Sequence, residues 1–88
     1  MTEKLLCGVP VAEWERSWRY AQELMSGYPS PDSRWQYVSQ LRLLQCFTLN
    51  DLLRRGVISR QKHTALKWQH EAVDQWLMKN YPGREVHL

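Results

Sequence analysis

The sequence predicts an all-α fold, in which one small domain of about three helices packs as a bundle. Apolar residues recur every three or four positions along most of the chain, and this spacing places them on one face of a helix. Proline, serine and glycine stand where such helices would begin and end. The 88 residues contain no linker, repeat or low-complexity tract, so residues 1–88 are expected to form a single domain.

The first helix is predicted over residues 10–26. Pro10 suits the first helical turn, where its missing N–H costs nothing, and Gly27 followed by Pro29 is a typical stop signal. The apolar side chains share one stripe: Val11, Trp14, Trp18, Ala21 and Met25. This stripe predicts that one face of the helix is buried. Residues 1–8 are expected to form a short flexible N-terminus.

The second helix is predicted over residues 31–55. Ser30 can cap it and Pro31 fits its first helical position, while Gly56 is a typical residue just beyond a helix end. The polar segment 48–51 leaves two alternatives. Either one helix runs through it, which we favour, or one of its side chains caps a separate short helix.

The third helix is predicted over residues 60–80. Ser59 is its natural N-cap, and the Tyr81-Pro82-Gly83 sequence ends it. The remaining residues, 83–88, are expected to form a loosely held C-terminal tail. Such a small core contributes little net stability, so association with a partner or with a second copy as a dimer is expected from size alone.

The third helix carries more apolar surface than one bundle face needs. At 100° per residue, its apolar and aromatic side chains cover roughly half the circumference, against the ~100° of a core-facing stripe. We therefore predict a protein-binding face made of Trp68, Ala72 and Trp76 with Leu77 beneath them, because tryptophan is enriched at binding hot spots. In the alternative interpretation, two neighbouring helices clasp the third and bury the whole arc.

A basic segment suggests a second kind of partner. Five cations occur within 14 residues that contain no acid: Arg54, Arg55, Arg60, Lys62 and Lys67. They flank a helix–glycine–helix junction that could bind nucleic acid through phosphate contacts. The match to a helix-turn-helix is poor, because Lys62 falls where such motifs bury an apolar side chain. On the protein-binding hypothesis, Arg60, Lys62 and Lys67 form a basic rim that attracts an acidic partner.

Patterns typical of catalysis or metal binding are not found in the sequence. The fragment from His70 to Asp74 resembles a zinc-protease motif but has aspartate where the second histidine is required. No other residues complete a zinc site of three or four ligands, and no phosphate-binding glycine loop occurs. Cys7 and Cys46 are expected to be reduced thiols, the second of them packed in the core. The sequence therefore predicts neither enzyme activity nor a metal or cofactor.

The distribution of apolar residues predicts a cytoplasmic protein. The longest uninterrupted apolar runs are far shorter than the ~20 residues that span a bilayer, and the N-terminus lacks the pattern of a secretory signal. Our leading hypothesis is a small bacterial or phage regulator, an adaptor, inhibitor or antiactivator, whose partner is another protein such as a transcription factor. Nucleic-acid binding through the basic segment is the alternative.

Overall fold

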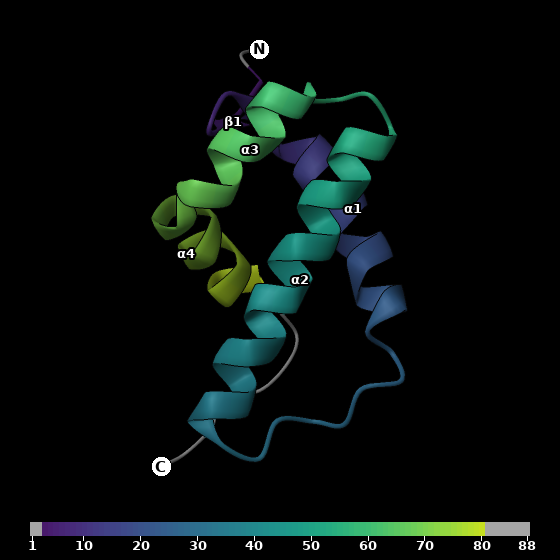
Figure 1. Cartoon of the computed structure of the whole chain (residues 1–88), viewed down its shortest axis with the longest axis vertical. Coiled ribbons are helices and arrows are strands. Elements are labelled where there is room, and N and C mark those ends of the chain that lie inside the picture. The colour runs from purple at the N-terminus through teal and green to yellow at the C-terminus, as the bar shows by residue number, and fades with distance from the viewer. Residues whose placement is uncertain (1–2, 81–88) are drawn as a thin grey trace.

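The computed structural model describes residues 3–80, and within them four helices and one two-stranded hairpin surround a common core (Figure 1). The elements are β1 (Leu5–Leu6), β2 (Val9–Pro10), α1 (Val11–Leu24), α2 (Arg34–Arg54), α3 (Arg60–Trp68) and α4 (His70–Asn80). The predicted all-α class is confirmed, with the hairpin as a small addition. The predicted C-terminal tail, 83–88, and the stop signal at 81–83 lie outside the described residues.

The hairpin at the start of the chain was not predicted. Cys7 and Gly8 both have positive φ angles, 53° and 79°, which is the backbone of the tight turns that join antiparallel strands. Leu6 pairs with Val9 across this turn, and the indole Nε1 of Trp14 donates a hydrogen bond to the Leu6 carbonyl oxygen at 2.9 Å. Part of the segment expected to be flexible is therefore tied to the first helix by a core side chain.

The start of α2 differs from the prediction because Ser33, not Ser30, is its N-cap. The Ser33 hydroxyl oxygen accepts a hydrogen bond from the backbone N–H of Gln36 at 3.1 Å. In return, the Gln36 side chain accepts one from the backbone N–H of Asp32 at 3.0 Å. This exchange is close to a capping box, which requires a glutamine or glutamate three residues after the cap. Ser30 has no such residue at that spacing, and the segment before Ser33 stays outside the helix.

The prediction that α2 runs unbroken through segment 48–51 is confirmed. The Thr48 hydroxyl donates a 2.6 Å hydrogen bond to the Leu44 carbonyl oxygen one turn earlier, so it does not compete for helix-starting N–H groups. The helix then ends at Arg54, and Gly56 lies just beyond its end, as predicted, with a φ angle of +76°. The Gly56 N–H bonds to the Leu53 carbonyl and the Val57 N–H to the Leu52 carbonyl, which is a Schellman C-cap.

The predicted third helix, 60–80, is two helices. Ser59 caps α3 as predicted, accepting a hydrogen bond from the Lys62 N–H at 3.1 Å. The helix then ends at Trp68, and Gln69 has a ψ angle of 70°, far from the helical value near −42°. The chain resumes helical geometry at His70 and turns so that α4 also packs against α2 (Figure 1). Neither glycine nor proline marks this break in the sequence.

The core lies where α1, α3 and α4 pack against α2. Its fully buried side chains come from all four helices, and the largest are Trp14, Leu44, Leu52, Leu66, Val73 and Leu77. The predicted stripe of α1 is buried only in part, because Val11 and Trp18 are half-buried while the other three residues are buried. Each helix thus packs one face into the core, and its other side chains are exposed or half-buried.

Candidate binding surfaces

The break at Gln69 divides the predicted aromatic face into an exposed part and a core part. Trp68 is 75% exposed, and Ala72 is exposed as well. Leu77 is fully buried, as its predicted place beneath the face requires. Trp76 is half-buried, and its ring packs against two tryptophans of α1, with centroid separations of 6.3 and 6.1 Å. The four residues therefore do not form one continuous exposed surface.

The exposed part of that face borders a hollow next to the hairpin. Trp68 and Ala72 line it together with Cys7, Gln69 and Glu71. The hollow exists because the helix break brings the last turn of α3 and the first turn of α4 beside the hairpin turn. An apolar ring and a neighbouring concavity are the features that protein-binding hot spots combine.

Two of the five tryptophans are about three-quarters exposed on the surface. Trp35, in the first turn of α2, is 76% exposed, nearly the same fraction as Trp68. A tryptophan that folding leaves in water retains most of its apolar area for burial by a partner. These two residues are therefore a matched pair, and only Trp68 borders the hollow described above.

The basic segment does not form one continuous charged surface. Arg60 and Lys67 are exposed on α3, as a basic rim requires. Lys62 is half-buried and lies over the hairpin turn, where its Nζ would be 3.2 Å from a Cβ placed on Gly8. Arg54 and Arg55 point instead toward acidic partners within the chain. Of the five cations in the nucleic-acid hypothesis, two are therefore exposed on α3, one lies over the hairpin turn, and two are paired with acidic side chains.

Asp51 is the centre of a polar cluster that joins α2 to α1. Its side chain is only 2% exposed, and its carboxylate accepts hydrogen bonds from Arg54 and from Arg55. Arg55 also donates to the Glu13 carboxylate at 2.6 Å and to the Ser17 hydroxyl oxygen at 2.7 Å. Because Glu13 and Ser17 belong to α1, the Arg55 guanidinium connects the two helices. This guanidinium is thus engaged in contacts within the fold.

The environment of Asp51 lowers the pKa of its carboxyl group. Burial alone would raise that pKa, but hydrogen bonds from Arg54, Ser17 and Arg55, with the charge of Arg54, outweigh the burial. The same pairing raises the pKa of Arg54. The folded structure therefore favours the charged forms of both the Asp51 carboxylate and the Arg54 guanidinium.

Acid is expected to destabilise the fold partly through Asp51. A carboxyl whose pKa is lower in the folded than in the unfolded chain adds stability above its ordinary pKa of ~3.9. This contribution is lost as the pH falls through the lowered folded value. Urea unfolding measured between neutral pH and about pH 3 should therefore show a falling free energy of unfolding. The Asp51→Asn variant should show a shallower fall, and equal slopes for the two proteins would contradict the assignment.

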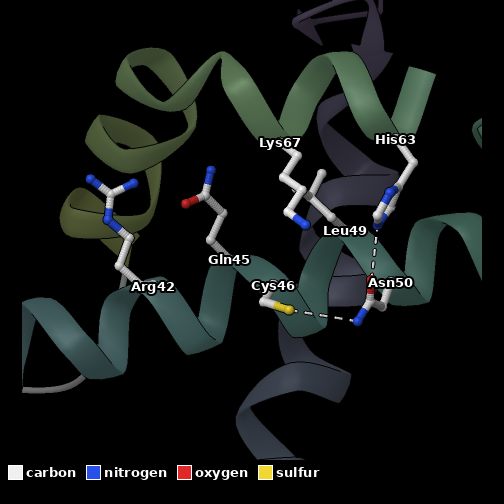
Figure 2. A pocket seen from close by; sticks show the side chains of 7 residues that line it. All are labelled: Arg42, Gln45, Cys46, Leu49, Asn50, His63 and Lys67. Atoms are coloured by element: carbon white, nitrogen blue, oxygen red, sulfur yellow. Dashed lines mark hydrogen bonds between the residues drawn. The ribbon is translucent and has the colours of Figure 1, made fainter. Parts of the chain in front are cut away.

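A second concavity lies between α2 and α3 (Figure 2). Its volume is about 160 Å³, and its lining residues are Arg42, Gln45, Cys46, Leu49, Asn50, His63 and Lys67. Figure 2 shows His63 and Lys67 extending from α3 toward α2, over Leu49. Cys46, which was predicted to pack in the core, is exposed at this site. The prediction was wrong because the core-facing side of α2 at this level is formed by Leu44, Thr48 and Leu52.

Most residues of this pocket were not predicted as site residues. Arg42, Cys46 and Asn50 stand four residues apart on α2, and His63 and Lys67 stand four apart on α3. Residues with this spacing share one face of a helix. The spacing could have identified each half of the site, but the packing of the two helices was needed to bring the halves together.

No family model, curated protein or solved structure matches this chain. Within residues 3–80, no helix has the length and apolar character that crossing a membrane requires. The part of the chain that the structure describes also contains no group of three or more histidine, cysteine, aspartate or glutamate side chains placed to hold a metal ion. The candidate surfaces are therefore interpreted from their own geometry.

Proposed function

We propose that this chain is a cytoplasmic protein-binding regulator, an adaptor, inhibitor or antiactivator, that acts by docking Trp68 and the adjacent hollow on a partner protein. The observation that carries the proposal is the 75% exposure of Trp68 at the edge of a concavity. A regulator of a transcription factor is one concrete form of this function. A second copy of the chain is another partner that the same face would accommodate.

Trp68 has the size to dominate such a contact. A tryptophan buries about 150–250 Å² when fully covered, and apolar burial contributes roughly 25 cal/mol per Å². Burial of only part of this area on binding would contribute the ~2 kcal/mol of binding free energy that defines a hot spot. The exposed Lys67 next to it in sequence, and Arg60 at the start of α3, supply positive charge that favours an acidic partner.

The ion pairs of Arg54 and Arg55 weigh against nucleic-acid binding as the main function. Binding to phosphate would compete with Asp51 for Arg54, and freeing Arg55 would leave the Asp51 carboxylate buried with less compensation. Only Arg60 and Lys67 of the five cations are exposed without such a role. A few phosphate contacts support only weak, strongly salt-dependent binding.

Trp68→Ala is expected to weaken partner binding strongly, while Trp35→Ala leaves it intact. Both side chains are about three-quarters exposed, so neither substitution should change the melting temperature appreciably. The loss of Trp68 should weaken binding by about 30-fold, the equivalent of ~2 kcal/mol. The measurement compares stoichiometric companions captured from host extract by the tagged wild type and each variant, with and without nuclease treatment.

The pattern across the variants decides the outcome. A companion held by the wild type and by Trp35→Ala, but lost with Trp68→Ala, supports the proposal. Loss with Trp35→Ala alone would place the interface on α2 and contradict it. If nuclease releases the companion, the basic segment becomes the functional site. Sedimentation of the purified wild type and Trp68→Ala tests whether the partner is a second copy.

A further inference from the structure

The pocket between α2 and α3 has the chemistry of a ligand site that is separate from the Trp68 surface. Its two walls come from helices that the Schellman turn at Gly56 folds against each other. Leu49, a buried member of the core cluster, lies at its floor, and most of the surface that lines the pocket is apolar (Figure 2). The pocket and the hairpin hollow share no lining residue, and on α3 they are lined by the neighbouring residues Lys67 and Trp68, which point in directions about 100° apart.

One wall of the pocket is ordered by hydrogen bonds between its own side chains. His63 Nε2 lies 2.9 Å from Asn50 Oδ1, and Asn50 Nδ2 lies 3.6 Å from Cys46 Sγ (Figure 2). Because an amide oxygen only accepts hydrogen bonds, Nε2 of His63 carries the donated hydrogen. This chain of contacts holds His63 across the gap between the helices and fixes the mouth of the pocket.

The charge of the pocket is positive. Lys67 and Arg42 both line it, and none of its lining residues is an acid. Arg42 also pairs with Asp74 of α4, Nη1 to Oδ2 at 3.4 Å, so part of its charge is compensated outside the lining. Lys67 has no such ion pair among the described contacts. A ligand group that enters this space is therefore favoured when it is an anion, and the mostly apolar lining of the pocket favours an apolar stem.

We propose that this pocket binds a carboxylate carried on a small apolar body. The volume of about 160 Å³ is close to the ~150 Å³ of a cavity that accepts benzene. A six-membered ring or a short aliphatic chain would lie over Leu49, and its carboxylate would accept charge-assisted hydrogen bonds from Lys67. A free organic acid and the side chain of a glutamate in a peptide share this chemistry. The inference does not depend on the proposed function of Trp68.

Alkylation of Cys46 measures occupancy of the pocket directly. Iodoacetamide forms a thioether when the cysteine sulfur displaces iodide, and the thiol proton passes to the buffer. A ligand in the pocket covers Cys46, whereas Cys7 in the hairpin turn is an internal control outside it. Benzoate is the probe and benzamide its neutral, equally sized control, both at constant ionic strength. Mass spectrometry of the peptides gives the rate at each cysteine.

Benzoate is expected to slow alkylation of Cys46 but not of Cys7, with half-protection at about 1 mM, and benzamide is expected to protect much less. Lys67→Met should weaken the benzoate effect about tenfold or more, because it keeps the side-chain length and removes the charge. Lys79→Met removes an exposed lysine of α4 outside the pocket and should change nothing. Urea unfolding of both variants checks that they fold.

Three results would overturn the proposal: equal protection by benzoate and benzamide, equal loss of protection in the two lysine variants, or no protection of Cys46 by benzoate at about 10 mM. A second probe identifies the source of the carboxylate. Stronger protection by the capped tripeptide Ala-Glu-Ala than by benzoate, with none by Ala-Gln-Ala, would indicate an acidic protein segment. Protection by benzoate and not by the tripeptide would indicate a free organic acid.

Discussion

Trp14→Ala is expected to leave little or none of the chain folded at room temperature. The Trp14 side chain is fully buried, packs against Trp76, and donates its indole hydrogen bond to the Leu6 carbonyl of the hairpin. Replacing a buried tryptophan by alanine costs about 3–5 kcal/mol. A core of this size contributes a net of only about 3–5 kcal/mol. The substitution therefore removes a stability equal to that of the whole domain.

The measurement is urea unfolding followed by far-ultraviolet circular dichroism. Trp14→Phe separates the two roles of the indole, since it keeps an aromatic ring in the core and removes the hydrogen bond to Leu6. It should cost about 1–3 kcal/mol, because the partly buried Leu6 carbonyl loses its donor and a smaller ring leaves space in the core. Trp35→Ala is the surface control. A Trp14→Ala protein with the same unfolding midpoint as Trp35→Ala would show that Trp14 is not the centre of the core.

Arg55→Met is expected to destabilise the fold by about 2–3 kcal/mol, although arginine is normally a surface residue. The guanidinium makes hydrogen bonds to the Glu13, Ser17 and Asp51 side chains. Its removal leaves the Asp51 carboxylate buried with Arg54 as its remaining cation. The cost comes from the weaker compensation of this buried charge and from the lost connection between α1 and α2.

The neighbouring arginine is a matched control. Arg54 also pairs with Asp51, but its side chain is 62% exposed against 25% for Arg55, and it makes no contact with Glu13 or Ser17 in the described cluster. Arg54→Met should therefore cost less than Arg55→Met, because Arg55 still pairs with the Asp51 carboxylate and still connects α2 to α1. Adding Asp51→Leu to Arg55→Met should recover part of the loss, because the buried charge is gone. Equal costs for Arg54→Met and Arg55→Met would contradict the proposed connection between the helices.

Helical spacing predicted part of the aromatic face correctly and part of it wrongly. Helical spacing identified Trp68 and Ala72 as a pair on one side of the helix, and both are exposed. The same spacing placed Trp76 beside them, but the helix break directs its ring to the tryptophans of α1. The break lets α4 turn back onto α2, and no residue at that point marks it in advance. The count of basic residues along the chain included Arg55 in the basic segment. Its charge is instead compensated by acidic side chains on two helices, Glu13 of α1 and Asp51 of α2.

The sequence by itself determined the helical class, the cap at Ser59 and the stop at Gly56, because these features depend on residues within one turn of each other, and it favoured a continuous α2. Only the tertiary structure decided the hairpin before α1, the break at Gln69 and the pocket between α2 and α3. Each of these depends on contacts between elements distant in the chain. Such contacts can outweigh local propensity because burying a shared core contributes more free energy than one cap or one helical turn.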